Sequence, residues 1–224
     1  GPGGVGGLHV LVAAGVAGVV AAGAGVVGFT GALGVGQITV VGTAITSPDE
    51  VRAATAVSDG TPMVRVDTGA VAARVGRLVP VRTATVTRQW PRTLVVRVVE
   101  RTPVAVVPAG AEFVLVDETG VAYQHLPQRP ERLPLLRLAA PAPAGATTRS
   151  ALAVLRALPV ELTGAMAALV ADAPARIRLE LADGRTVVWG DSTENEAKVR
   201  VALVLLGRPG RVLDVSAPTL VTVR

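Results

Sequence analysis

The sequence contains no cysteine and few aromatic residues: two tryptophans, one tyrosine and two phenylalanines in 224 residues. The lack of cysteine excludes disulfide bonds, thiol nucleophiles and thiolate metal sites, although it leaves the cellular compartment open. Because half of the residues are hydrophobic and so few are aromatic, valine, alanine and leucine must fill the interior. A chain of this length can form one large domain or two small ones, each with its own core.

Lysine is almost absent as well, since Lys198 is the only one, and arginine supplies most of the positive charge behind a net charge of +5. The arginines are spread singly along the chain, and no basic run is interleaved with aromatic residues. Nucleic-acid-binding surfaces are usually built from such runs, so the charge does not indicate one. We interpret the arginine excess as the coding bias of a GC-rich genome. The diffuse positive charge would fit a weak attraction of the protein to an anionic membrane or cell-wall polymer.

No catalytic or cofactor-binding pattern is present. The sequence lacks an HExxH, a GxSxG, a P-loop or a GxGxxG in a convincing context. His125 is the only histidine after residue 9 and lies in an expected loop, where a lone histidine is usually just solvated. The aspartates in SDG, DETG and ADG lie in glycine-containing, turn-like sequences without calcium-loop spacing. We therefore expect a protein that is not an enzyme and has no cofactor and no metal site.

The first charged side chain is Asp49, and residues 8–33 form an uncharged, largely apolar run. A bilayer core of about 30 Å needs about 20 such residues as a helix, and glycine is common in membrane helices. The run predicts a single transmembrane helix within an N-terminal segment, residues 1–34, after a preceding segment that carries the orienting charges. The alternative is a cleavable export signal cut near Ala21 and Ala22. In both cases the rest of the chain is expected outside the cytoplasm.

After this run the pattern predicts a first small α+β module. Residues 37–42 are a β-branched strand, and residues 47–57 begin a helix with Ser47 as N-cap and Glu50 closing a capping box. A second helix is expected over residues 66–79, ended by Pro80, and strands over 81–88 and 93–100. The order β-α-α-β-β predicts a three-stranded sheet with two helices on one face.

The remainder predicts a second, mixed α/β domain that is richer in strands. Asp183-Gly184 marks a hairpin, a strong turn signal. Strands are expected at 113–117, 121–124, 135–138, 176–181, 185–189, 212–215 and 220–223, and helices at 147–158, 162–170 and 193–205.

The end of the first module and the start of the second contain RQWPRTLVVRVVERTPVAV, residues 88–106, which places one of two tryptophans against a proline. Pro91 restricts the turn between two strands, and Trp90 is expected to cover the end of the sheet. Leu94, Val96 and Val98 alternate onto one face. We interpret the segment first as structural framework.

In this order of elements and in several motifs, the chain resembles the FtsQ/DivIB family of bacterial cell-division proteins. The motifs are ITVVGT (38–43), RLVPVRTATVTRQWPRTLVVRVVERTPVAV (77–106), LVDETGVAY (115–123), LADGRTVVWGDSTENEAKVRVALVLL (181–206) and VLDVSAP (212–218). One departure is Leu78-Val79-Pro80, which leaves a local turn in question. The residues that carry the resemblance are Gly42, Pro80, Glu100, Arg101, Pro103, Asp117, Gly120, Gly184, Gly190, Lys198 and Asp214.

The resemblance implies a single-pass protein of the inner (plasma) membrane at the division septum, with a POTRA domain (residues 35–103) and a C-terminal β domain (104–224). It implies a non-enzymatic scaffold of the divisome, the cell-division machinery, whose β domain binds the small membrane proteins FtsB and FtsL. The scaffold would link early division proteins to late ones, including the septal peptidoglycan synthase machinery. Two alternatives stay open: an exported POTRA-containing chaperone for secretion or outer-membrane assembly, and a cell-wall enzyme-like module.

Two interaction surfaces follow from the resemblance. FtsB would add a strand at the C-terminal edge, where TLVTV carries no charge to repel it; an ordinary capped edge is the alternative. Upstream division proteins would recruit the chain through the POTRA domain. The expected edge residues are Ser216, Ala217, Thr219, Leu220, Val221, Thr222 and Val223, and the expected recruitment residues are Val81, Arg82, Thr85, Arg88, Trp90 and Pro91.

Overall fold

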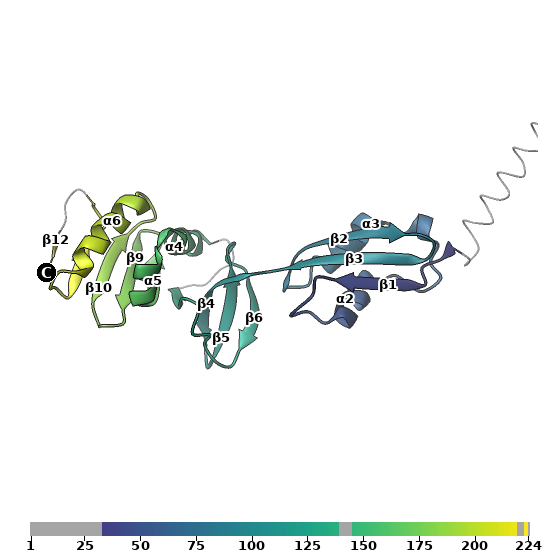
Figure 1. The fold of residues 1–224 in the computed structure, drawn as a ribbon, viewed down its shortest axis with the longest axis horizontal. Coiled ribbons are helices and arrows are strands. Elements are labelled where there is room, and N and C mark those ends of the chain that lie inside the picture. Colours follow the sequence, from purple (N-terminus) through teal and green to yellow (C-terminus); the bar gives the residue numbers. More distant parts are fainter. Residues whose placement is uncertain (1–32, 139–144, 219–221, 224) are drawn as a thin grey trace, which may run out of the picture. The chain divides into compact units, whose positions relative to one another are not determined.

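The computed structural model describes residues 33–138, 145–218 and 222–223, which form two compact units separated between Glu100 and Arg101 (Figure 1). The predicted membrane helix lies outside the described residues, apart from Leu33. Within the described ranges, no helix combines the length and the apolar character needed to cross a bilayer.

The N-terminal unit has the predicted β-α-α-β-β order. Its elements are β1 (Gln37–Val41), α2 (Pro48–Thr55), the short 3-10 helix η2 (Met63–Arg65), α3 (Thr68–Val75), β2 (Val81–Gln89) and β3 (Thr93–Glu100). The strand order is β1-β3-β2, with β1 parallel and β2 antiparallel to the central β3. Leu94, Val96 and Val98 are buried against residues of both α2 and α3, so the two helices cover one face of the sheet, as predicted.

The helix boundaries in this unit differ in detail from the prediction. Ser47 caps α2, but its hydroxyl accepts from the amide of Asp49, the second helical residue. α3 is shorter than expected: it starts after Asp67, whose carboxylate accepts from the amide of Ala70, and ends at Val75. The predicted helix to residue 79 is therefore wrong, because the chain turns at Gly76, ahead of Pro80.

The C-terminal unit begins with a three-stranded antiparallel meander, β4 (Pro103–Ala109), β5 (Glu112–Asp117) and β6 (Ala122–Leu126). The rest builds a mixed six-stranded sheet of order β12-β11-β10-β9-β8-β7. The amide of Val106 in β4 donates to the Pro134 carbonyl, which ties the meander to the start of the larger sheet. The larger sheet contains β7 (Leu136–Leu138), β8 (Met166–Ala173), β9 (Arg176–Leu181), β10 (Thr186–Gly190), β11 (Val212–Asp214) and β12 (Thr222–Val223), and the helices are α4 (Ala146–Ala157), α5 (Val160–Ala165) and α6 (Asn195–Leu206).

One predicted element of this unit is wrong in part: of the helix predicted over residues 162–170, only residues 162–165 are helical. α5 ends at Ala165 and the chain continues as β8. Leu169 faces the main core, whereas Ala168 and Val170 pack with Val106 and Leu135 on the other face of the sheet. A strand buried on both faces is apolar without alternation, so periodicity cannot separate it from a buried helix.

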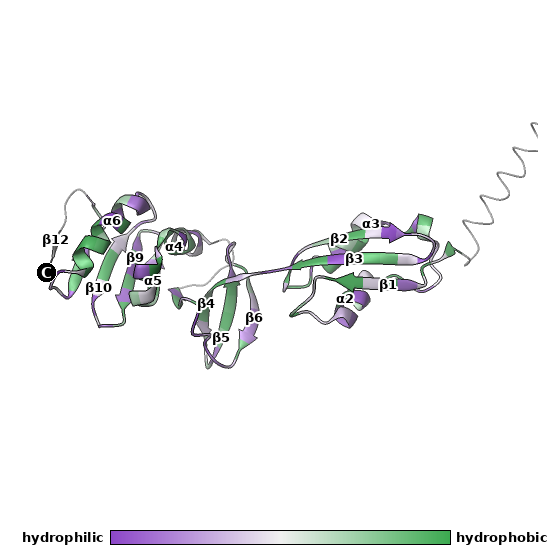
Figure 2. Cartoon of the chain, viewed as in Figure 1, coloured by the Kyte–Doolittle hydropathy of each residue, from purple (hydrophilic) through white to green (hydrophobic). Residues whose placement is uncertain are grey.

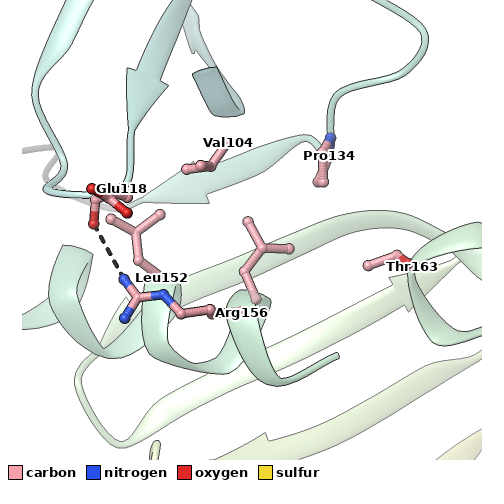
Figure 3. A pocket seen from close by; sticks show the side chains of 7 residues that line it. Val104, Glu118, Pro134, Leu152, Arg156 and Thr163 are labelled. Atoms are coloured by element: carbon pink, nitrogen blue, oxygen red, sulfur yellow. Dashed lines mark hydrogen bonds between the residues drawn. The ribbon is translucent and has the colours of Figure 1, made fainter. Parts of the chain in front are cut away.

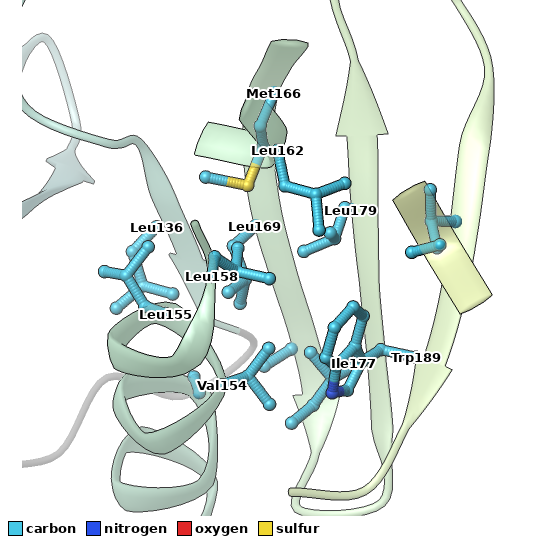
Figure 4. Packing of buried hydrophobic residues seen from close by; sticks show 14 of the residues in the cluster. Leu136, Val154, Leu155, Leu158, Leu162, Met166, Leu169, Ile177, Leu179 and Trp189 are labelled. Atoms are coloured by element: carbon cyan, nitrogen blue, oxygen red, sulfur yellow. The ribbon is translucent and has the colours of Figure 1, made fainter. Parts of the chain in front are cut away.

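The core of the C-terminal unit is one large cluster around Trp189, Ile177, Leu179 and Leu169, with α4 packed on the sheet (Figure 4). Trp189 is fully buried, and its indole nitrogen donates to the side-chain oxygen of Asn195 at 2.9 Å. Satisfying that donor allows so large a side chain to lie inside the core without an unpaired polar group.

Candidate interaction surfaces

The C-terminal edge comprises β11 and β12, residues 212–214 and 222–223, which form the outer part of the six-stranded sheet. β11 pairs parallel with β10, and β12 pairs antiparallel with β11, Leu213 opposite Val223 and Asp214 opposite Thr222. β12 is the outermost strand in this order, so β11 bonds one side of it. The outer side of such a strand offers main-chain donors and acceptors to an added strand.

A tight turn leads from β11 toward β12. The Asp214 carboxylate accepts from the Ser216 amide at 2.9 Å and from the Ser216 hydroxyl at 2.7 Å. Gly190 packs beneath this turn with φ of +80°, and a Cβ added there would lie 2.9 Å from the Cβ of Ser216. Only glycine fits both the left-handed backbone and the close approach. The end of β10 therefore supports the turn that carries the chain into the edge.

Lys198 and Asp191 hold the loop that follows Gly190. The Lys198 ammonium group is buried in α6 and donates to the Asp191 carboxylate at 2.7 Å and to its carbonyl at 3.0 Å. The hydrogen bond from Lys198, joined by two from Thr193, lowers the pKa of Asp191 to about 2. Ser192 and Thr193 lie in this loop, and α6 starts at Asn195, two residues later than the predicted helix.

This role of Asp191 is not among the predictions from the sequence. A signal was present, since Asp191 lies seven residues before Lys198, the only lysine in the chain.

Of the seven residues predicted for partner binding, Ser216 and Ala217 are exposed and Thr222 and Val223 form β12. Thr219, Leu220 and Val221 lie outside the described residues. The described positions thus fall on the turn and on the outermost strand. Partner binding there stays a prediction.

β2 is the outer strand of the N-terminal sheet and contains most of the predicted recruitment residues. Arg82 and Thr85 are exposed, whereas Val81 is fully buried beside Val51 and Val75. A buried side chain cannot contact a partner, so Val81 belongs to the core and not to a recruitment surface.

The end of β2 also helps to hold the fold, through the side chain of Arg88. The Arg88 guanidinium donates to the main-chain carbonyl oxygens of Met63 and Val66. Trp90 and Pro91 form the turn into β3, and Trp90 is 52% exposed. The indole therefore covers the end of the sheet only in part.

Two of the carboxylates that carry the family resemblance, those of Glu100 and Asp117, stabilise main-chain turns. Glu100, at the end of β3, accepts from the amides of Ala44, Ile45 and Thr46 at 2.7–3.1 Å. Burial works to raise its pKa, but these hydrogen bonds outweigh burial and the pKa is lowered. Gly42, with φ of +89°, brings this loop so close to β3 that a Cβ would lie 2.1 Å from the Val98 carbonyl oxygen.

Asp117 has the corresponding position in the meander. Its carboxylate accepts from Arg101 at 2.6 Å and from the amides of Thr119 and Val121. Burial raises its pKa, but hydrogen bonds led by the Thr119 hydroxyl and by Arg101 outweigh burial and lower it. The remaining residues that carry the resemblance lie at turns or strand starts. Pro80 precedes β2 and Pro103 is the first residue of β4, whereas Gly120 and Gly184 lie in hairpin turns with φ of +86° each.

A cavity of about 190 Å³ lies between the meander and α4, lined by apolar side chains with Glu118, Arg156 and Thr163 (Figure 3). Arg156 spans it to the Glu118 carbonyl oxygen at 3.4 Å. His125 is exposed and contacts Glu112 at 3.2 Å. No group of three or more potential metal ligands occurs in the described ranges. The Arg156–Glu118 and His125–Glu112 contacts each join two segments of the C-terminal unit.

Comparison with known proteins covers both units. Residues 33–101 match the family described as POTRA domain, FtsQ-type, and residues 105–215 match the family described as cell division protein FtsQ/DivIB, C-terminal. Among solved structures, the extracytoplasmic domain of the trans isomer of cell division protein DivIB from Geobacillus stearothermophilus covers 39% of this chain and 76% of its own, at 21% identity and a TM-score of 0.31. That overlap is too small to carry a structural argument.

Curated relatives extend over nearly the whole chain. Cell division protein FtsQ of Mycobacteroides abscessus is 37% identical over 225 residues, covering 100% of this chain and 72% of that protein. The Mycobacterium tuberculosis protein is 39% identical over 219 residues, covering 97% and 69%. The Streptomyces bingchenggensis protein is 39% identical over 197 residues, covering 84% and 74%. The predicted resemblance is confirmed, and the chain belongs to the FtsQ/DivIB family of cell division proteins.

Proposed function

We propose that this protein is a non-enzymatic, membrane-anchored scaffold of the divisome that binds FtsB and FtsL through its C-terminal unit. The observation that carries the proposal is the outermost position of β12 in the six-stranded sheet. The neighbouring sequence TLVTV has no charge and no proline, the residues by which natural edge strands usually block pairing. An extended FtsB segment adds to this edge as a further strand.

The turn and loop beneath the edge support the same assignment. A strand added by main-chain hydrogen bonds needs an edge whose position is fixed before binding, because ordering it on binding costs affinity. The Asp214–Ser216 hydrogen bonds, the close packing of Gly190 and the buried Lys198 ammonium group fix the approach to that edge.

The remaining parts of the scaffold come from the N-terminal region. The uncharged run of residues 8–33 anchors the chain in the plasma membrane, with both units outside the cytoplasm. The exposed outer strand β2, through Arg82, Thr85 and the end near Arg88, receives upstream division proteins. The scaffold thereby couples early division proteins to the late ones reached through FtsB and FtsL.

The edge assignment is tested by Val221→Pro in a pull-down with the extracytoplasmic segments of FtsB and FtsL. Proline removes a main-chain donor and is disfavoured in paired strands, so FtsB capture should be lost. Val160→Pro is the matched control: Val160 is 77% exposed and is the first residue of α5, where proline is tolerated, and Pro159 before it is already extended.

Both variants should melt like the wild type, and the control should retain FtsB. If Val221→Pro melts early, Val221→Arg replaces it, since a charge opposes strand addition without restricting the backbone. Retention of FtsB by a folded edge variant would overturn the assignment of the edge.

The divisome role is tested in the host by depletion with a fluorescent fusion in the same cells. A mid-cell band together with unseptated filaments or branches on depletion is expected. A uniform envelope signal with normal septa would overturn the role and would favour an exported POTRA-containing chaperone.

A further inference from the structure

Three segments meet at one end of the N-terminal unit: residues 34–37, 60–65 and 88–92. The amides of Gly36 and Gln37 donate to the Arg92 carbonyl at 2.8 and 3.2 Å, and the Arg92 guanidinium donates to the Gly34 carbonyl at 3.2 Å. The Val35 amide donates to the Thr61 carbonyl at 2.8 Å. The β2–β3 turn and the segment that leads into η2 are therefore hydrogen-bonded to residues 34–37, which lead into β1, at the end where β2 finishes in Figure 1.

This end is also the one from which the apolar run departs. The run ends at Leu33, and Gly34 is the next residue. If residues 8–33 span the bilayer, as the proposed function holds, the β2–β3 turn is bonded to residues that directly follow the span. Covalent continuity therefore keeps this turn within a few residues' reach of the membrane surface.

The same end exposes side chains that suit a lipid headgroup layer. Trp90 is 52% exposed and Val64 is 58% exposed, and both line one hollow together with Thr68, Val86, Thr87 and Arg88. Arg88 holds η2 at this place through the Met63 and Val66 carbonyl oxygens. An exposed indole is costly in water, and the large exposed apolar side chains of this unit include both Trp90 and Val64.

The charges at this end are mixed, with three basic and two acidic residues. Arg65 lies on the second of these segments and Arg88 and Arg92 on the third, with Asp59 and Asp67 as the acidic residues beside them. The Asp67 carboxylate caps α3. Tryptophan favours the bilayer interface, where its ring is half-buried and its N–H is hydrated, and arginine favours the anionic phosphates of the same layer.

We propose that the Trp90–Pro91–Arg92 turn and Val64 form a membrane-interface contact, in which the indole inserts into the headgroup layer of the bilayer that holds the chain's own anchor. The contact docks the end of the N-terminal unit on the membrane and assigns Trp90 and Pro91 to lipid and not to a recruiting protein. The proposal rests on the membrane anchoring in the proposed function.

The test uses tryptophan fluorescence of the whole chain reconstituted without any partner into vesicles of phosphatidylcholine and phosphatidylglycerol at three to one. Since Trp189 is fully buried and Trp90 is the other tryptophan, the signal of a Trp90→Phe variant subtracted from the wild type isolates Trp90. We expect a blue-shifted Trp90 emission, and stronger quenching by lipids brominated near the headgroup than by lipids brominated near the chain end.

Val99 supplies the matched control, because it is also 52% exposed and belongs to the same unit. It lies six residues along β3 from Thr93, roughly 20 Å from the turn at the rise of a strand. A tryptophan placed there, as Val99→Trp in the Trp90→Phe background, should keep a water-like emission and escape quenching.

The outcomes separate the two proposals. Flotation of the chain with the vesicles checks the anchor first, and failure to float would overturn the membrane placement itself. A chain that floats while Trp90 keeps a water-like, unquenched emission would overturn the interface contact alone. Equal quenching at positions 90 and 99 would also overturn it, because it would mean that the whole unit lies on the lipid.

Discussion

The two units use arginine differently. In the N-terminal unit, arginines donate to main-chain carbonyl oxygens of other segments: Arg52 to Ile38, Arg74 to Thr55, Arg88 to Met63 and Val66, and Arg92 to Gly34. In the C-terminal unit, ion pairs with carboxylates are more frequent, as in Arg101–Asp117, Arg137–Glu180, Arg178–Asp172 and Arg185–Asp183, although Arg129, Arg156 and Arg185 also donate to carbonyl oxygens.

Core size explains the difference. The N-terminal unit divides its interior into two clusters of five buried residues each, whereas one cluster in the C-terminal unit has 22. A small domain buries a smaller share of its surface, so its loops need other bonds to hold them. Arginine, with five donors and a long stem, can reach loop carbonyls that would otherwise lack partners. The small unit therefore adds side-chain to main-chain bonds to its two small cores, whereas the large unit has a larger packed core.

Trp189→Ala should have the largest effect. Removing the largest fully buried side chain leaves a cavity and frees its Asn195 partner, at a cost of about 3–5 kcal/mol in the unfolding free energy of the C-terminal unit. Hydrogen exchange should show lost protection from Arg101 onward, with the N-terminal unit unchanged.

The control is Trp90→Ala, which truncates a half-exposed indole and should cost less than about 0.5 kcal/mol. Equal loss of protection in both units after Trp189→Ala would contradict independent units.

Arg88→Lys tests the main-chain bonding of the small unit. Lysine keeps the charge but loses the planar fork that reaches two carbonyl oxygens, so the N-terminal unit should lose about 1–3 kcal/mol. Arg137→Lys is the matched change in the C-terminal unit, where the Arg137–Glu180 pair is half-exposed, and should cost below about 1 kcal/mol. Denaturant unfolding of both variants compares them, and a larger loss for Arg137→Lys would refute the contrast.

The smallest expected effect is on how the stability of each unit changes at acid pH. The pKa of Glu100 and that of Asp191 are both lowered in the folded protein, so each carboxylate stabilises its unit above its ordinary pKa, and the effect is lost as the pH falls through the lowered value. For Asp191 that value is about 2, against 3.8 ordinarily. Its side chain is half-exposed, so solvent screening limits the effect to about 1 kcal/mol or less.

Between pH 5 and pH 2, Glu100→Gln should flatten the stability profile of the N-terminal unit, and Asp191→Asn that of the C-terminal unit. Melting curves at stepped pH check both. A profile for Asp191→Asn that runs parallel to the wild type down to pH 2 would contradict the role of the Lys198 hydrogen bond.

The sequence by itself determined the family, the β-α-α-β-β order of the first unit and most strands of the second. These follow from local physics: alternation buries Leu94, Val96 and Val98, and turns form at Asp183-Gly184 and at Trp90-Pro91. Partner binding at Ser216, Ala217 and residues 219–223 stays a prediction from motif resemblance; of these residues, Ser216 and Ala217 lie on the turn and Thr222 and Val223 form β12.

Only the tertiary structure decided what depends on neighbours distant in sequence. The helix predicted over residues 162–170 is partly the strand β8, because both of its faces are covered by other elements. Val81 is buried because α2 and α3 pack over the start of β2. α6 is hydrophobic along much of its length (Figure 2). Its charged Lys198 is nevertheless buried, whereas its apolar Val204 is 61% exposed. A one-dimensional pattern records which residues alternate, whereas burial depends on which surfaces meet after folding.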